Sequence, residues 1–305
     1  MSELLPLSWA RTNTLNPVYR SLSLPLSGTR WVTYADLPGD YDFSSVGKDL
    51  EGLFPEGFLI RGCSRKTANS LEQQGGEVLR TGAEAVLYPQ NGHFEKKSLC
   101  KLLQQAGKKG RIAEIPLDDV NRERLRELQQ KARHGTKPQL SHVFRTYPFE
   151  GCRCFVVLSD KQEWYAAVTL SIRDELVAHT ELLLKHVQSP PGIMEFLLAG
   201  VFQVLCKEGF REWSLGEVPF YHLDREKNIR MEERMMALAA GLCRKVYDFN
   251  GLFYFKNKFG PEWRDVYLFS NRGISLLTFA DLAIQSRYSD LLARRLLDDF
   301  MKFFF

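Results

Sequence analysis

The sequence has no apolar run of the roughly 18–20 residues that a membrane-spanning helix needs. Its N-terminus lacks the charged and then apolar pattern of a secretory signal. Six cysteines are scattered through 305 residues. Only Cys152 and Cys154 stand close together, and no nearby histidine completes a zinc site. We therefore expect a cytoplasmic protein with reduced structural thiols and no bound metal.

Several catalytic signatures are absent as well. The sequence contains no Walker loop, no G-x-S-x-G turn and no metal-ligand spacing among its six histidines. The acetyl-CoA signature R/Q-x-x-G-x-G/A is missing too. The analogous strand-to-helix position holds residues 189–193 (SPPGI), whose prolines have no amide to offer a pyrophosphate. These absences argue against a CoA donor, and we expect no cofactor.

The composition is that of an ordinary globular protein, with 44% hydrophobic and 26% charged residues. The net charge of +4 is unevenly distributed. Residues 96–137 hold twelve Lys/Arg against five Asp/Glu, a surplus of +7, so the rest of the chain is near −3. Such a basic segment is typical of a phosphate-binding surface, on nucleic acid or anionic lipid. A solvated helical face is an equally good explanation from charge alone.

Hydrophobic periodicity and turn residues predict alternating strands and helices. We expect strands near residues 31–34, 58–62, 77–80, 83–88, 111–115, 154–158, 164–170, 176–183, 213–216 and 266–269. Helices are expected at 64–74, 96–109, 118–132, 193–206, 231–242 and 277–292. The helix at 193–206 is apolar on nearly every face, which predicts a buried central helix. The pattern predicts an α+β fold.

We place a domain boundary near the linker-like residues 135–138 (GTKP). Residues 1–30 are expected to form an N-terminal arm with little structure. Residues 31–136 would then form one αβ domain that carries the basic helix, and residues 137–305 a second domain that carries the chemistry.

The most informative stretch is residues 247–263 (YDFNGLFYFKNKFGPEW). A turn at Asn250-Gly251 is expected to lead into an aromatic and lysine segment that the Gly260-Pro261 break closes. If this segment is extended, Lys256 and Lys258 share one face. Aromatic residues interleaved with lysines suit a cleft for an anionic, partly flat ligand.

Three segments in the second half resemble a known family. They are residues 191–197 (PGIMEFL), 213–219 (WSLGEVP) and 247–263. Their order and spacing are similar to P-x-G-x-M-[DE]-F-L, N-L-G-x-x-P and F-x-G-L-x-x-[FY]-K-x-K-F-x-P-x-W of the C-terminal domain of phosphatidylglycerol lysyltransferases. In the first half, residues 81–85 (TGAEA) and the basic helix fit more weakly. Ser214 stands where the family usually has Asn, and Glu217 replaces an apolar residue.

The resemblance implies tandem GNAT-like acyltransferase domains, each a mixed, mostly antiparallel sheet flanked by helices. The implied activity is transfer of an aminoacyl group from aminoacyl-tRNA onto a phosphatidylglycerol-like lipid or another hydroxyl or amine acceptor. Family members usually follow a membrane flippase domain, and we expect this chain to act without one. The implied partners are aminoacyl-tRNA and an anionic lipid or membrane surface.

Transfer from a tRNA ester needs orientation, one assisted proton transfer and oxyanion stabilisation, but no strong protein nucleophile. Glu195, at the start of the central helix, is a candidate to bind the substrate α-ammonium, and Glu217 a candidate for the amine or side chain. Asn250 would orient the ester carbonyl or make a turn. For each carboxylate, a plain structural charge is an equally good interpretation.

The remaining candidates concern binding. Lys256 and Lys258 would contact tRNA or lipid phosphates, with Ser214, Tyr247 and Trp263 lining the substrate site. For Tyr247 and Trp263 a core or cleft-wall position is the simpler interpretation, as is a structural role for His179. The tRNA itself would be held by the exposed lysines of the basic helix, which are Lys96, Lys97, Lys101, Lys108 and Lys109.

Two alternatives stay open at this point. One is an acyl-CoA or acyl-carrier-dependent N-acyltransferase, and the other is a non-catalytic GNAT-like module that binds RNA or membrane. Residues 291–305 join arginines and a lysine to leucines and a terminal Phe-Phe-Phe. This basic amphipathic segment would either rest on a membrane surface, which would make the protein peripheral, or pack against the domain or a second copy.

Overall fold

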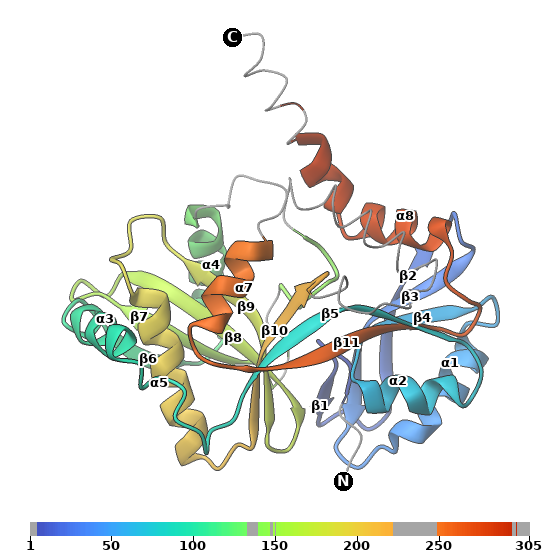
Figure 1. The fold of residues 1–305 in the computed structure, drawn as a ribbon, viewed down its shortest axis with the longest axis horizontal. Helices are drawn as coiled ribbons and strands as arrows, with labels where there is room; N and C mark the ends of the chain where they lie inside the picture. Colours follow the sequence, from blue (N-terminus) through green and yellow to red (C-terminus); the bar gives the residue numbers. More distant parts are fainter. Residues whose placement is uncertain are drawn as a thin grey trace.

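The described residues form an eleven-stranded mixed sheet with helices on its faces (Figure 1). The structure is a computed structural model, and it describes residues 5–132, 140–146, 149, 151–221, 249–294 and 297. Within these residues, no helix is long and apolar enough to cross a membrane. The helix expected at residues 231–242 lies outside this part of the chain.

The strands follow the expected alternation closely. Their bounds are β1 Ala10–Thr12, β2 Val18–Leu24, β3 Thr29–Pro38, β4 Phe58–Cys63, β5 Glu77–Leu87, β6 Arg111–Ile115, β7 Arg153–Leu158, β8 Trp164–Asp174, β9 Val177–Lys185, β10 Glu212–Pro219 and β11 Glu262–Ser270. The two strands expected at 77–80 and 83–88 are one strand, β5. Three of the pairings are parallel, β1 with β3, β3 with β4 and β9 with β10, and the other described pairings are antiparallel.

The helices also lie mostly where the sequence predicts them. Their bounds are α1 Val46–Leu53, α2 Arg65–Glu72, α3 Lys97–Gly107, α4 Asp119–Lys131, α5 Ile193–Lys207, α7 Phe249–Asn257 and α8 Leu276–Gln285, with a 3₁₀ turn at Phe43–Ser45. Ser64 caps α2 and Asp118 caps α4 through their side chains. The last predicted helix is divided in two: α8 ends at Gln285, Arg287 adopts a positive φ of 58°, and residues 288–294 are helical again.

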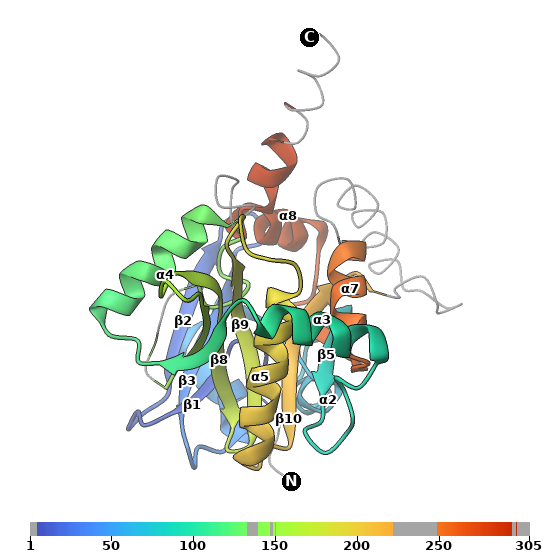
Figure 2. The same cartoon turned by 90° about the vertical axis from the view of Figure 1, so that its left-hand side faces the viewer.

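Strand β7 shows how the helices divide between the two faces of the sheet. Phe155 and Val157 pack with α3 and α5 in one core, whereas Cys154 and Val156 pack with α4 in another. Successive residues of a strand point to opposite faces, so α5 and α4 lie on opposite sides of the sheet. Figure 2 shows this arrangement, with α3, α5 and α7 on one side and α4 on the other.

The sheet does not separate at the predicted boundary near residue 136. The strand order is β1-β3-β4-β11-β5-β10-β9-β8-β7-β6, with β2 paired to β3. Strand β11, from the C-terminal part of the sequence, lies between β4 and β5, and β6 pairs with β7. Segments from both sides of residue 136 therefore interleave in one sheet.

Residues 5–30 are part of this sheet instead of forming an arm. Strands β1 and β2 both pair with β3. Leu5 and Trp9 are fully buried in the core with α1 and α2. The polar, proline-containing sequence of this segment does not indicate its two strands, because one of them lies at an edge where alternate residues face solvent.

The segment that leads to Lys256 and Lys258 is the helix α7, so the extended arrangement in which both lysines would share one face does not occur. Phe249 and Lys256, the buried residues of α7, are seven positions apart and share one helical face. Lys258 follows the last turn. The two lysines therefore point in different directions, and Asn250 is an exposed residue of the first helical turn instead of a hairpin turn.

Candidate functional site

The candidate site begins where β9 and β10 stop pairing. Their parallel register covers only Glu212 to Ser214 on β10, opposite Val177 to His179 on β9. Immediately afterwards the register of β10 against β5 shifts between Ser214 and Glu217. Gly216 supplies the irregular backbone with a φ of +87°, a conformation that glycine adopts without a Cβ penalty. Beyond Ser214 the two strands are no longer hydrogen-bonded to each other.

Lys256 of α7 is directed at this divergence. Its ammonium donates a hydrogen bond of 3.0 Å to the backbone carbonyl of Glu217, and its side chain is only 6% exposed. A Cβ on Gly216 would lie 3.5 Å from Nζ, so the glycine also leaves room for the lysine. Burial lowers the pKa of Lys256 from 10.5 to about 7, although Glu217 and Glu84 oppose this shift. At neutral pH a substantial fraction of the amine is therefore uncharged.

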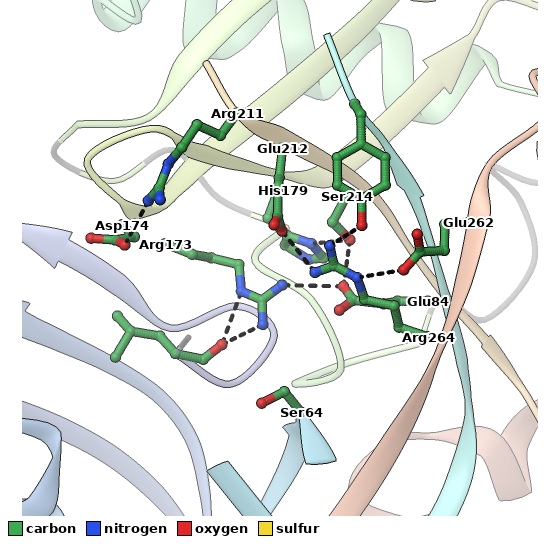
Figure 3. Close-up of polar contacts among 12 residues, drawn as sticks. Ser64, Glu84, Arg173, Asp174, His179, Arg211, Glu212, Ser214, Glu262 and Arg264 are labelled. Carbon is green, nitrogen blue, oxygen red and sulfur yellow. Dashed lines mark hydrogen bonds and ion pairs between the residues drawn. The ribbon is translucent and has the colours of Figure 1, made fainter. Parts of the chain in front are cut away.

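A second group of buried polar side chains lies beside the lysine. The Glu84 carboxylate of β5 accepts a hydrogen bond of 2.8 Å from the Ser214 hydroxyl and one of 3.1 Å from the Arg173 guanidinium of β8. Figure 3 shows both side chains directed at this carboxylate. All three residues are at most 3% exposed. The buried carboxylate is thus fully provided with hydrogen-bond partners, which offsets the cost of its burial.

His179 completes this cluster. Its Nδ1 lies 3.2 Å from the Ser214 hydroxyl oxygen. Because the one Ser214 proton goes to Glu84, Nδ1 must carry a hydrogen and donate it. Burial, and then the charges of Arg173, Lys256 and Arg61, hold the pKa of His179 well below 6.5. The ring is therefore neutral, which suits a structural role and equally a proton-accepting Nε2.

Glu217 is held by a different set of partners. Its carboxylate pairs with Arg61 of β4 and accepts a hydrogen bond of 3.2 Å from Thr81 of β5. Arg61 also donates to the Val143 carbonyl at 3.2 Å. The Glu217 side chain is 4% exposed. In this structure it joins β4, β5 and β10, and its backbone carbonyl is the group that meets Lys256.

Glu195 and Lys258 form a separate ion pair. Glu195 lies in the first turn of α5, and its Oε1 accepts from Lys258 Nζ at 2.8 Å. The carboxylate side chain is 9% exposed, whereas the lysine side chain is 50% exposed. The predicted acidic and basic residues are thus brought together as two pairs, one deep at the strand divergence and one near the surface.

The aromatic candidates gather beside α7. The rings of Tyr221, Phe253 and Trp263 lie within 5.1 Å of one another, centroid to centroid. Trp263 Nε1 lies 3.4 Å from the Asn257 side-chain oxygen. Trp263 therefore belongs to an aromatic wall, the simpler of the two expectations. Asn250 is exposed and does not join the cluster, and Tyr247 lies outside the described residues.

The five lysines assigned to tRNA are all exposed on or next to α3. This helix packs through Leu99 and Ala106 against the core that also contains Ile193 and Leu197 of α5. Its lysines project from the side away from the sheet. The structure places them on one helix but gives them no contact with the buried cluster.

Some members of the cluster were not identified as site residues from the sequence. Glu84, Arg173 and Arg61 are charged residues that lie buried or half-buried within strands β5, β8 and β4. A charged residue at an inward position of a buried strand was the available signal, because such groups are rarely buried without partners.

Other features lie apart from the cluster. No three His, Cys, Asp or Glu side chains of the described residues are grouped as a metal site. A cavity of about 400 Å³ is lined by Glu51, Gln74, Gly76 and Arg272, among others. It adjoins the start of β5, whereas Glu84 lies near the other end of that strand. We assign the chemistry to the buried cluster, because Lys256, Glu84 and His179 gather there and none of them lines the cavity.

Residues 29–270 match the family model described as "Phosphatidylglycerol lysyltransferase, C-terminal". The chain belongs to this family. The match runs from β3 through β11 and includes the residues of the cluster around Lys256. The expected α+β fold and the expected family are both confirmed.

Relatives with known names agree with this assignment. A phosphatidylglycerol lysyltransferase of Bacillus subtilis (strain 168) is 32% identical over 101 residues, which are 32% of this chain and 12% of that protein. The chain thus aligns with a small part of this relative's length. The structure of L-PGS from Bacillus licheniformis has a TM-score of 0.69 at 18% identity, covering 88% of this chain and 85% of the other.

A second solved structure has the same fold. The C-terminal domain of a protein described as a lysylphosphatidylglycerol synthetase from Agrobacterium fabrum has a TM-score of 0.64 at 16% identity. The match covers 90% of this chain and 84% of the other. At these identities the two structures establish the shared fold, while the family model establishes the family.

Proposed function

We propose that this chain transfers an aminoacyl group from aminoacyl-tRNA onto a hydroxyl of a phosphatidylglycerol-like lipid. Membership of the lysyltransferase family supports the reaction class. The observation that carries the proposal is Lys256, a buried amine with a lowered pKa at the divergence of β9 and β10. Buried amines of this kind are suited to proton transfer near neutral pH.

In the proposed reaction Lys256 acts as the general base. The acceptor oxygen forms a bond to the carbonyl carbon of the aminoacyl ester, and the bond from that carbon to the ribose oxygen breaks. The neutral amine of Lys256 takes the proton of the acceptor hydroxyl and delivers it to the departing ribose oxygen. This role differs from the phosphate contact expected from the sequence, because a side chain 6% exposed is better suited to a small hydroxyl group than to a phosphate on the surface.

We assign the substrate α-ammonium to Glu195. Its partner in this structure, Lys258, is half-exposed. The α-ammonium of a substrate resembles the lysine ammonium and could take its place on the carboxylate. Displacing a surface lysine costs little, since exposed ion pairs contribute about 0–1 kcal/mol. Glu217 is the weaker candidate for this role, because Arg61 and Thr81 already occupy its carboxylate. Asn250 and Trp263 stay predictions for the outer part of the site.

The donor would approach over α3, whose exposed lysines carry the positive charge that tRNA phosphates require. Because aminoacyl-tRNA is a cytoplasmic molecule, we place the reaction on the cytoplasmic side of the membrane that holds the lipid. The protein would then work as a peripheral enzyme.

The test is transfer of label. The protein is incubated with aminoacyl-tRNAs charged with radiolabelled amino acids and with vesicles that contain phosphatidylglycerol, and label is counted in the organic phase. We expect label to move into lipid with at least one amino acid, and Lys256→Met to slow transfer by about 100-fold or more. Lys161→Met, a change in an exposed turn, should leave the rate unaltered.

Two outcomes would overturn the proposal. Label that stays on every tRNA tested, with folded protein, would favour a binding module. Transfer that instead depends on an acyl-CoA would favour the N-acyltransferase alternative. Unchanged transfer by Lys256→Met would remove that lysine from the reaction.

A further inference from the structure

Helix α8 packs Phe279 and Leu282 against the core of Leu24, Trp31 and Leu59, but it also buries two polar residues and exposes three apolar ones. Thr278 and Asp281 are only 3% and 1% exposed. By contrast Leu276, Leu277 and Ile284 are between 52% and 60% exposed. An amphipathic helix on a globular protein normally shows the opposite pattern. A second apolar surface of α8, formed by Leu276, Leu277 and Ile284, is therefore presented to the surroundings.

The buried aspartate fixes this orientation. Asp281 accepts hydrogen bonds from the backbone amides of Leu26 and Ser27, at 3.1 and 2.8 Å, and from the Ser27 hydroxyl at 2.9 Å. A capping box between Ser275 and Thr278 holds the first turn. Turning the leucines inward would leave Asp281 and these donors without partners, at a cost of several kcal/mol. The outward leucines are thus a stable feature of the fold.

The exposed face forms a patch with positive charge at its ends. Leu26, whose amide is bound to Asp281, is 47% exposed beside the helix. Residues 271–294 contain three arginines, all exposed, and two aspartates. One aspartate is the buried Asp281, and the other pairs with Arg287. The patch is defined as Leu26, Leu276, Leu277 and Ile284, and the exposed Arg272 and Arg294 on either side of α8 in the sequence add positive charge to this apolar surface.

The patch lies at the same end of the molecule as the divergence of β9 and β10. Strand β10 runs from the paired residues at Glu212 toward the divergent residues at Pro219. In Figures 1 and 2 this strand runs toward the upper end of the molecule, where α8 also lies. A flat surface that touched α8 would therefore face the end of the sheet where β9 and β10 part.

We propose that the α8 patch docks this chain onto a bilayer surface that contains anionic lipid. Leucine and isoleucine side chains enter the boundary between headgroups and acyl chains, while arginines contact lipid phosphates. The choice of a bilayer over a second protein copy rests on the proposed function, because a lipid acceptor must reach the strand divergence from a membrane.

Vesicle flotation tests the docking. The probes are vesicles of phosphatidylcholine alone and vesicles with an added phosphatidylglycerol fraction, mixed with the intact protein. Wild type should float with the anionic vesicles, and Leu277→Ser with Ile284→Ser should lower its partition by about tenfold or more. The matched control is Leu53→Ser with Val120→Ser, which removes two exposed apolar side chains from α1 and α4 and should keep the wild-type partition.

A soluble acceptor separates the docking from the chemistry. Transfer to glycerophosphoglycerol, which has the headgroup without acyl chains, should proceed equally in wild type and in the α8 variant. Docking without transfer by wild type would sink the proposed function and leave the surface assignment standing. Equal flotation of wild type and the α8 variant would overturn the assignment. So would a wild-type dimer in sizing chromatography that the variant abolishes, with no vesicle binding by wild type.

Discussion

Lys256 shows how one buried residue can link stability to chemistry. The side chain is surrounded by the Glu217 carbonyl, Gly216 and the His179 ring. The amine has one direct hydrogen bond and little contact with solvent. The effect of burial on its pKa therefore outweighs the attraction of Glu217 and Glu84. The protein accepts a destabilising amine at this position, which is common at functional sites.

Replacing this lysine should change how stability depends on pH. In the folded protein the pKa of Lys256 is about 7, against 10.5 for the ordinary side chain. Between these values the unfolded chain binds more protons, so the wild type gains stability as pH rises and loses it as pH falls toward 7. Relative to Lys256→Met, the free energy of unfolding of wild type should increase by about 2–4 kcal/mol from pH 7 to pH 10.

Denaturant unfolding of the two proteins across this pH range measures the difference. The variant Lys161→Met serves as the control, and its difference from wild type should stay constant with pH. Parallel pH curves for wild type and Lys256→Met would show that the buried amine keeps an ordinary pKa.

At the scale of elements, the sequence predicts the helices and strands that short stretches of residues determine. Helices α2 and α4 begin directly after the capping residues Ser64 and Asp118. The apolar run at 193–206 corresponds to the buried helix α5. Asn250-Gly251 resembles a turn, so the sequence does not predict a helix here. In the structure, residues 249–257 form α7, which buries Phe249 and Lys256 on one face. The ion pair between Glu217 and Arg61 could not be predicted, because the two residues are 156 positions apart in the sequence.

Helix α3 should determine how tRNA binding depends on salt. Each lysine that contacts a phosphate contributes about 0.7–0.9 to the slope of log Kd against log salt. The triple change Lys97→Ser, Lys101→Ser and Lys108→Ser should therefore reduce that slope by about 2–3. Binding of labelled tRNA between low and moderate salt, followed by fluorescence anisotropy, gives the slope.

The matched control removes three exposed lysines elsewhere, at Lys48, Lys161 and Lys207. It lowers the net charge equally, so it should weaken binding slightly without the same loss of slope. Identical slopes for the two triple variants would mean that α3 is a solvated face and that tRNA binds another surface.

At the scale of the whole molecule, dividing the chain at the predicted boundary near residue 136 should not yield an N-terminal fragment that folds alone. A chain of residues 1–136 lacks β11, which separates β4 from β5 in the sheet. It also leaves β6 without its partner β7. We expect this fragment to be unfolded or aggregated alone, and co-expression with residues 137–305 to restore a soluble complex. Circular dichroism and sizing chromatography report the outcome, and a cooperative, monomeric fragment would contradict it.

The late position of β11 also bears on how the protein is made. Strand β5 ends at Leu87, and β11 begins at Glu262. At about 5–20 residues per second, a ribosome needs roughly 10–35 s to synthesise the intervening segment. During that interval the nascent chain exposes the unpaired borders of β4 and β5, which are templates for wrong pairing. A chaperone at the exit tunnel would therefore have a long window in which to shield them.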